Sequence, residues 1–324
     1  MFDYVFRNAT IIDGTGSEAF TGDVALKDGR IETIAPLIES DATEVVDCVG
    51  KTLSPGFIDM HSHADAVILG YPRMESMVFQ GITTFVACQC GHSIAPVGSL
   101  WEGSQALYHL YHAVSGNLYA DMYGGINYSS SEKIIPLIEK EFGFSPRWES
   151  MGEFMDEVDA KGLSGNMITL AGYNTLRLIN ADPDKKTFLT DKQKDIIKGQ
   201  IRECLEAGAF GMSTGLDYKP GIFAETTELI EMAEVLKRTG GIYFSHWRKT
   251  GLRSGTPKKQ KKINGIREAM DIGLANDVQV QISHISNGYD VYPSRDDDVH
   301  RFVAEKTLAV VDGYHRKDVM YILM

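Results

Sequence analysis

The sequence predicts an α/β protein, a TIM-type (β/α)8 barrel of about seven strands behind a small N-terminal β module. Three observations carry this prediction. Short strand patterns and turn signals fill residues 1–53, and apolar strands alternate with longer helical segments over residues 54–324. Histidine and cysteine side chains recur where several of these later strands end. Alternation of this kind is typical of parallel strands joined by helical crossovers.

Residues 1–53 form the predicted β module. Asp13-Gly14-Thr15-Gly16 and Asp28-Gly29 supply turn residues, and Asp-Gly between two strand patterns is a strong signal for a hairpin. The pattern changes after Ser54-Pro55-Gly56, so we place the end of the module there. The expected strands are 4–6, 9–12, 23–27 and 31–34.

The barrel is expected over residues 54–324, because a complete (β/α)8 barrel takes about 250 residues. Residues 98–157 are predicted to be a mostly helical insertion of unassigned role, which leaves room for fewer strands than eight. The chain stops inside the apolar segment 318–324, so we expect an incomplete barrel and a C-terminally truncated chain. The expected strands are 57–60, 82–88, 167–170, 210–213, 242–244, 278–282 and 319–323.

Three of the connecting helices carry local signals. Thr190 and Gln193 form a capping box that predicts a helix start, and Gly240-Gly241 predicts the end of the next helix. The expected apolar faces are Ile196, Ile197, Ile201 and Leu205; Leu229, Met232, Ala233 and Leu236; and Ile263, Ile266, Met270 and Ile272.

Charge and composition exclude several classes of partner. The chain has 32 Lys and Arg against 44 Asp and Glu, a net charge of −12, which disfavours nucleic acid and anionic membranes as partners. One short basic run is interpreted as a solvated segment: Lys258, Lys259, Lys261 and Lys262. No apolar run approaches the roughly 20 residues of a membrane helix, and Met1-Phe2-Asp3-Tyr4 is not the start of a signal peptide. We therefore expect a cytoplasmic protein of undetermined oligomeric state.

The four cysteines are too few and too irregular for a disulfide framework. Reduced thiols or a metal ligand remain possible. Cys90 follows the expected strand 82–88 and would reach the same end of the barrel as the strand-end histidines. We interpret Cys48, Cys88 and Cys204 as small core residues.

Four histidines on three strands predict a metal site. His61-Ser62-His63 follows the first barrel strand, and a period of two puts both imidazoles on one side. His246 and His284 end two later strands. Each histidine alone is more often structural than ligating, but their shared placement at strand ends favours a zinc site, where Cys90 could ligate or bridge. We treat the others as non-ligands: His92, His109, His112, His300 and His315.

Five segments resemble one known family. Residues 55–63 read PGFIDMHSH, which is similar to the opening motif of the amidohydrolase superfamily. Four others resemble motifs of the N-acyl-D-amino-acid deacylases, or D-aminoacylases: GITT at 81–84 leading into CGHSIAP at 90–96, GMSTGLDYKPG at 211–221, SHWR at 245–248 and QISH at 281–284. The segments are collinear, and the resemblance runs from residue 4 to the end of the chain.

The resemblance implies a function. It implies that Cys90, His246 and His284 hold one tightly bound zinc, while His61 and His63 face a second, weaker metal position. It further implies deacylation of small N-acyl-D-amino acids, a linear amide hydrolysis by metal-activated water. The residues we assign to substrate binding are Arg248, Tyr218 and Ser286.

The chain also departs from the family pattern. The aspartate that delivers a proton to the leaving amine, and a downstream arginine, would lie beyond residue 324, so we assign no catalytic side chain. Ser286 stands where the family has a lysine for the substrate carboxylate. Tyr173 replaces a histidine and Thr250 an acidic residue, which bears on specificity for D-amino acids.

Two alternatives stay open. A cyclic-amide hydrolase, similar to a dihydropyrimidinase or dihydroorotase, would bridge its metals with a carboxylated lysine on the strand after the insertion, and residues 167–172 contain no lysine. The other alternative is a truncated, non-catalytic fragment of a deacylase. Its signal is the apolar end of the chain.

Overall fold

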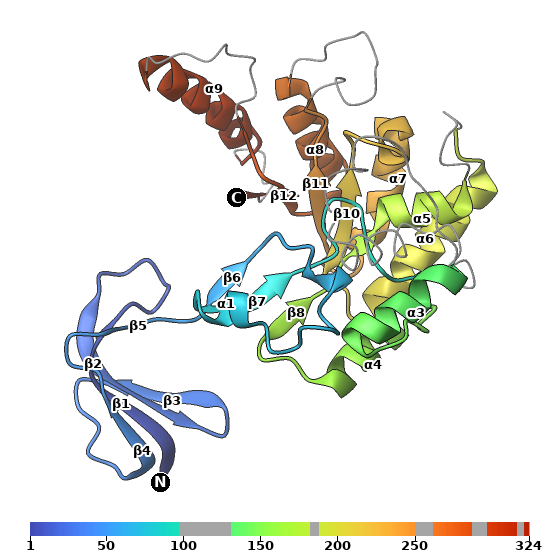
Figure 1. Ribbon diagram of the computed structural model, residues 1–324. Coiled ribbons are helices and arrows are strands. Elements are labelled where there is room, and N and C mark those ends of the chain that lie inside the picture. Colours follow the sequence, from blue (N-terminus) through green and yellow to red (C-terminus); the bar gives the residue numbers. More distant parts are fainter. Residues whose placement is uncertain (97–130, 182–187, 250–261, 287–296, 316–320, 324) are drawn as a thin grey trace. The chain divides into compact units, whose positions relative to one another are not determined.

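The computed structural model describes residues 1–96, 131–181, 188–249, 262–286, 297–315 and 321–323. It divides into two compact units, Met1–Phe57 and Ile58–Met324 (Figure 1). The expected boundary was residue 53. Among the described helices, none combines the length and the apolar character needed to cross a membrane. The basic run at 258–261, His109 and His112 lie outside the described residues.

The first unit is a five-stranded sheet. Antiparallel pairs join β1 to β2 and β2 to β3, while β4 and β5 run parallel to β1. The Asp28-Gly29 hairpin is confirmed, since both residues adopt a positive φ between β2 and β3. The strands are β1 (Phe2–Ile11), β2 (Phe20–Lys27), β3 (Arg30–Ala35), β4 (Ala42–Asp47) and β5 (Thr52–Leu53).

Strand β1 corrects the sequence prediction, which split it into 4–6 and 9–12. The register shifts between Phe6 and Ala9, where Asn8 has a φ of 60°. The buried Asp23 carboxylate accepts the Asn8 N–H at 2.9 Å and the Ile38 N–H at 2.9 Å, so a β-bulge, rather than a turn, interrupts the alternation. Strands β4 and β5 were not predicted.

The second unit contains the parallel strands of the expected barrel. One sheet has the order β6-β7-β8 and the other β13-β12-β11-β10-β9, so each strand lies beside the next along the chain, as in a (β/α) barrel. Each of the seven predicted segments overlaps a strand, and β9 was not predicted. The strands of this unit are β6 (Phe57–Asp59), β7 (Ile82–Val86), β8 (Asn166–Ile168), β9 (Ala171–Gly172), β10 (Gly211–Gly215), β11 (Ile242–His246), β12 (Val280–Ile282) and β13 (Tyr321–Leu323).

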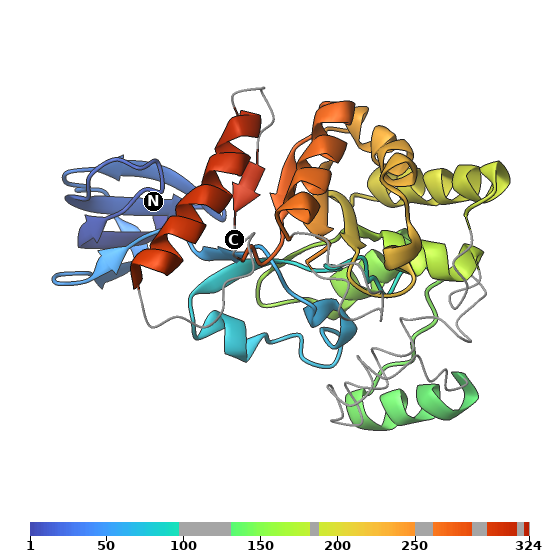
Figure 2. The same ribbon diagram turned by 90° about the horizontal axis from the view of Figure 1, so that it is seen from above.

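Helices alternate with these strands, and from α5 to α9 each helix contacts the next (Figure 2, light green to red). The 3₁₀ turns are η1 (Ala64–Ala66) and η2 (Gly221–Phe223). The helices are α1 (Glu75–Val78), α3 (Ser131–Phe142), α4 (Met151–Lys161), α5 (Tyr173–Asn180), α6 (Asp191–Glu206), α7 (Thr226–Lys237), α8 (Lys262–Asn276) and α9 (Asp297–His315). Helix α3 lies in the predicted insertion 98–157, and α4 begins in it but extends four residues beyond its predicted end. Residues 98–130 of the insertion are outside the described residues.

The capping box of α6 is confirmed, with the Thr190 hydroxyl accepting the Gln193 N–H at 3.3 Å. The expected apolar face is wrong in one position. Ile196 is 41% exposed, and Cys204 is buried instead. The helix therefore turns the face of Ile197, Ile201, Cys204 and Leu205 to the core. The apolar residues predicted for α7 and α8 are all buried.

Candidate metal centre

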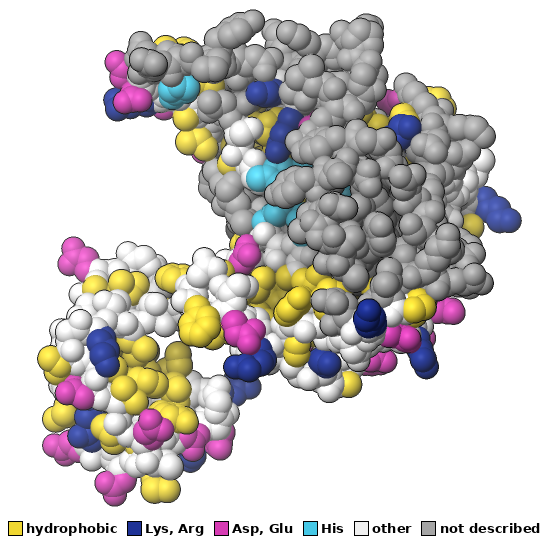
Figure 3. Space-filling model, viewed as in Figure 1, with side chains coloured by type: hydrophobic (Ala, Val, Ile, Leu, Met, Phe, Trp, Pro, Cys, Tyr) yellow, Lys and Arg dark blue, Asp and Glu magenta, His cyan; other side chains and the backbone are white. Residues whose placement is uncertain are grey.

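The predicted ligands come from four separate strands. His61 follows β6, Cys90 follows β7, His246 is the last residue of β11, and His284 follows β12. Parallel strands end on one side of a sheet, so the order of strands brings these side chains to the carboxyl end of the barrel. Histidine side chains (cyan) gather at a hollow on the surface of this unit in Figure 3.

Their ligand atoms converge. Cys90 Sγ lies 3.3 Å from His61 Nε2, 3.3 Å from His246 Nδ1 and 3.7 Å from His284 Nε2. His284 Nε2 lies 3.0 Å from His246 Nδ1. The ligand atoms of His61, Cys90 and His284 all lie within 4.8 Å of one another.

These distances fit a tetrahedral zinc ion. Zinc bonds of about 2.3 Å to sulfur and about 2.0 Å to nitrogen, at tetrahedral angles, separate sulfur from nitrogen by roughly 3.5 Å and two nitrogens by roughly 3.3 Å. One thiolate with imidazoles is a ligand set that zinc favours. The residues present therefore suit the metal that the resemblance implies.

The charge states of the ligands also suit a cation. Burial, followed by the neighbouring His63 and His284, lowers the pKa of His61 to about 3, so its imidazole is neutral and able to ligate at neutral pH. Burial raises the pKa of the Cys90 thiol to about 12, against smaller lowering effects of Tyr218 and Lys249. A bound cation would stabilise the thiolate that burial disfavours.

His63 lies at the edge of this cluster. Its ring centroid is 5.5 Å from that of His61, and the residue is exposed. Nearby, the buried Asp65 carboxylate accepts the Cys88 N–H at 3.2 Å, and burial raises the pKa of that carboxyl. A second metal position at His61 and His63 stays a prediction.

The backbone around Cys90 is held in an unusual shape. Cys90 has a φ of 59° and His284 a φ of 38°, both in the left-handed region that L residues rarely adopt. On β10, the Ser213 hydroxyl donates to the Cys88 carbonyl at 2.5 Å and accepts the Gly91 N–H at 3.0 Å. Side-chain hydrogen bonds from a neighbouring strand therefore fix the turn that presents the thiol.

Tyr218 supports the same turn. Its hydroxyl donates to the Cys90 carbonyl at 2.5 Å, and its ring packs edge-on against His246 at 5.1 Å. His92 stacks on the Tyr218 ring, with 5.1 Å between the ring centroids. It therefore lies beside the ligand cluster and is not part of it. A Cβ on Gly215 would come within 2.2 Å of both the Cys90 carbonyl and the Tyr218 hydroxyl. The geometry favours positioning of Cys90 over the predicted contact with substrate.

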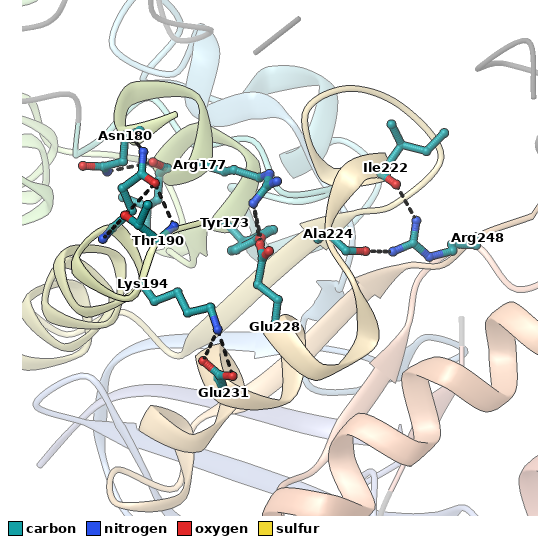
Figure 4. Close-up of polar contacts among 12 residues, drawn as sticks. Tyr173, Arg177, Asn180, Thr190, Lys194, Ile222, Ala224, Glu228, Glu231 and Arg248 are labelled. Atoms are coloured by element: carbon teal, nitrogen blue, oxygen red, sulfur yellow. Dashed lines mark hydrogen bonds and ion pairs between the residues drawn. The ribbon is translucent and has the colours of Figure 1, made fainter. Parts of the chain in front are cut away.

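Arg248 also contacts protein groups. Its Nε donates to the Glu268 carboxylate at 2.9 Å, and its Nη1 donates to the Ile222 carbonyl at 2.9 Å and the Leu216 carbonyl at 3.4 Å. Its Nη2 donates to the Ala224 carbonyl (Figure 4). These bonds pin the segment between β10 and α7, so they favour a structural role for Arg248. Ser286 is exposed two residues after His284, and its substrate role stays a prediction.

Sequence reasoning missed two charged features near the site. Arg177 and Glu228 form a buried ion pair at 2.5 Å, with Tyr173 donating its hydroxyl to the same carboxylate (Figure 4). The spacing of Tyr173 and Arg177 on one helix face was the available signal. Lys249 Nζ lies 2.6 Å from His284 Nδ1 and 5.5 Å from the centre of the Trp247 ring. Nothing in the sequence pattern pointed to that contact.

Comparison with known proteins identifies relatives of this chain. No protein-family profile matches the chain. An N-acyl-D-aspartate deacylase from Alcaligenes xylosoxydans xylosoxydans is 32% identical over 286 residues, 87% of this chain and 49% of the relative. A D-aminoacylase from the same organism is 30% identical over 283 residues, 87% of this chain and 50% of the relative. The chain thus spans about half the length of these curated relatives.

Solved structures similar to this chain include enzymes with the same kinds of names as these relatives. The crystal structure of a D-aminoacylase has a TM-score of 0.76 and 27% identity, covering 100% of this chain and 58% of that chain. An N-acyl-D-glutamate deacylase from Bordetella bronchiseptica, complexed with zinc and a phosphonate inhibitor, has a TM-score of 0.75 and 26% identity, covering 99% and 58%. Over the part that it covers, the chain is therefore homologous to the N-acyl-D-amino-acid deacylases, or D-aminoacylases, of the amidohydrolases.

Proposed function

We propose that this chain is the metal-binding part of a zinc-dependent hydrolase that deacylates small N-acyl-D-amino acids. The observation that carries the proposal is the convergence of the Cys90 thiol with the His61, His246 and His284 imidazoles at distances of 3.0–3.7 Å. Three relatives support it, because they are named an N-acyl-D-aspartate deacylase, a D-aminoacylase and an N-acyl-D-glutamate deacylase.

In this proposal Cys90, His246 and His284 hold the tight zinc. When bound there, the ion supplies a Lewis acid for the amide carbonyl and lowers the pKa of water to near neutrality. Tyr218 and Ser213 fix the turn that aims the thiolate, by their hydrogen bonds to the Cys90 and Cys88 carbonyls. These residues therefore act by position and not by proton transfer.

A second, weaker metal position would use His61 and His63, with the Cys90 thiolate shared between the two ions. A study of D-aminoacylase describes a binuclear centre with one-metal activation and second-metal attenuation. In this chain, the 3.3 Å distance between His61 Nε2 and Cys90 Sγ supports the sharing. One tight zinc per chain, with a second that dialysis removes, is the expected stoichiometry.

Zinc content of purified variants tests the assignment. Cys90→Ala and His246→Ala should lower bound zinc from about one per chain to well below one, because each removes a ligand. Cys48→Ala is the matched control, because Cys48 is buried in the first unit. This variant should keep its zinc. Full zinc content in Cys90→Ala would eliminate the proposed centre.

Hydrolysis tests the reaction separately. The zinc-loaded chain is assayed for amine release from N-acetyl-D- and N-acetyl-L-amino acids, and for ring opening of a cyclic amide such as dihydrouracil to its ureido acid. The proposal expects release from linear D-substrates only. Preferential opening of the cyclic amide would replace the proposed reaction class.

A further inference from the structure

We propose that Lys249 is an anion-binding residue that metal binding releases from His284, so that its ammonium receives the carboxylate of the substrate. This inference rests on the proposed function, because it concerns the ligand of the same site. It assigns the carboxylate contact to a residue that lies outside the family motifs of the sequence.

The starting observation is the position of Lys249. The residue lies three positions after His246 at the end of β11, and its backbone N–H donates to the buried Asp217 carboxylate at 3.2 Å. Its half-buried side chain reaches His284, with Nζ 2.6 Å from Nδ1, and passes over the Trp247 ring at 5.5 Å. A fixed backbone and a packed stem thus deliver a positive charge to the edge of the ligand cluster.

The contact with His284 determines which ring nitrogen carries the proton. A lysine ammonium has only donors, so Nδ1 must accept and the proton of the neutral ring must sit on Nε2. That arrangement suits the 3.0 Å contact between His284 Nε2 and His246 Nδ1. It leaves no lone pair on Nε2 for a metal.

A metal on Nε2 requires the opposite tautomer. The ring then carries its proton on Nδ1, which becomes a donor and cannot accept from the ammonium. The Lys249–His284 hydrogen bond and the metal–His284 bond therefore exclude each other, without any change in the total number of protons on the ring. Binding of zinc must displace the ammonium from Nδ1.

The displaced ammonium remains close to the reaction centre. It is tethered about one imidazole ring away from the metal position, next to the Trp247 face. In an N-acyl amino acid, only the nitrogen and one carbon separate the scissile carbonyl from the carboxylate. A carboxylate held by Lys249 therefore leaves the acyl carbonyl within reach of the ligand cluster. The charge-assisted hydrogen bond between ammonium and carboxylate would stabilise the substrate in that orientation.

Lys249→Met tests the two halves of the inference, because it keeps the stem and removes the charge. Zinc affinity, measured by competition with a chromophoric chelator, should rise about tenfold, since the hydrogen bond that competes for His284 is gone. In the same variant, zinc-loaded protein should bind N-acetyl-D-alanine about tenfold or more weakly by calorimetry. Binding of N-acetyl-D-alaninamide, which lacks the carboxylate, should be unchanged.

The opposite signs separate this role from a structural one. A variant that merely loosened the fold would weaken zinc and both ligands together, which would overturn the inference. Equal loss for the acid and its amide would overturn it as well. Lys249→Arg should restore the preference for the acid. Lys237→Met, which removes a surface lysine paired with Asp277 at 3.7 Å, is the matched control and should change neither affinity.

These binding measurements are independent of the proposed reaction. If the wild-type chain binds zinc and prefers the acid through Lys249 but releases no amine, the proposed hydrolysis fails and the inference stands. If the chain hydrolyses N-acyl-D-amino acids and Lys249→Met keeps the preference for the acid, the inference fails and the proposed function stands. A ¹⁵N spectrum of His284 adds a direct check, with Nε2 protonated without zinc and Nδ1 protonated with it.

Discussion

At the scale of single residues, Tyr218 contacts the backbone of one proposed ligand, Cys90, without belonging to the proposed ligand set. Tyr218→Phe removes the hydroxyl that donates to the Cys90 carbonyl at 2.5 Å. We expect zinc affinity to fall about ten- to hundredfold, as for other groups that orient metal ligands. In the cobalt-substituted protein, the thiolate-to-metal absorption band should weaken.

Tyr314→Phe is the control for this prediction. It removes a hydroxyl that donates to Asp271 at 2.5 Å, between α9 and α8 and away from the ligands. Its zinc affinity and cobalt spectrum should match the wild type. An unchanged spectrum in Tyr218→Phe would show that the turn is held without the hydroxyl.

A second residue-scale prediction concerns the buried ion pair. Arg177 and Glu228 are 2% and 4% exposed, so Glu228→Gln removes a buried carboxylate from beside a buried guanidinium. The free energy of unfolding should fall by about 3–5 kcal/mol in urea titrations. Glu231→Gln lies on the same helix, breaks a surface pair with Lys194 and should lower it by at most about 1 kcal/mol. If Glu228→Gln and Glu231→Gln lowered the free energy of unfolding equally, burial of the ion pair would not determine the loss of stability.

The residues also show what sequence can and cannot reveal. The candidate ligands could be singled out because a histidine or cysteine at the end of a parallel strand has a defined destination. The roles of Arg248, Tyr218 and Lys249 could not be, because each depends on groups that are distant in sequence and meet only in the fold: Glu268, the Cys90 carbonyl and His284.

At the scale of elements, the end of β10 sets how closely the Cys90 turn can approach. Gly215→Ala would place a methyl group within 2.2 Å of the Cys90 carbonyl, which is backbone and cannot turn aside. We expect lost zinc content together with a lower melting temperature. Gly199→Ala, inside α6 with nothing within 4 Å of the added methyl, should instead stabilise by up to about 1 kcal/mol. Retention of zinc by Gly215→Ala would contradict the close packing.

Elements with strong local signals were predicted well. The Thr190 capping box and the Asp28-Gly29 hairpin appear where expected, because each is decided by a few adjacent residues. The bulge at Asn8 was missed because its partner, Asp23, lies on another strand. Ile196 was misplaced because periodicity alone does not decide which side of a broad apolar face meets the core.

At the scale of the whole molecule, the proposed ligands all belong to one of the two compact units. Zinc should therefore stabilise Ile58–Met324, by about 2.7 kcal/mol at a free concentration one hundred times its dissociation constant. Amide hydrogen exchange checks this prediction, with slower exchange expected in β10, β11 and β12 and no change in β1 to β3. Cys90→Ala should show no zinc effect. Protection that appeared equally in the first unit would contradict a site confined to the second.

The order of strands was the feature of the whole molecule that the sequence predicted most directly. Alternation of apolar strands and helices predicted parallel neighbours in chain order, and the two sheets of the second unit have that order. The register between strands was beyond reach, because short buried strands lack the polar alternation that fixes it. Register decides that Gly215 lies opposite His246, and so that the Cys90 turn meets the His246 ring.

The left-handed backbone of Cys90 and His284 has a consequence for how such a chain can evolve. Each of these conformations costs an L residue on the order of 1 kcal/mol, which glycine or asparagine would largely avoid. Selection for thermal stability alone would replace Cys90 and His284 with residues that tolerate a positive φ, and the proposed metal binding would be lost. Retention of both residues across orthologues would therefore record selection for their chemistry rather than for stability.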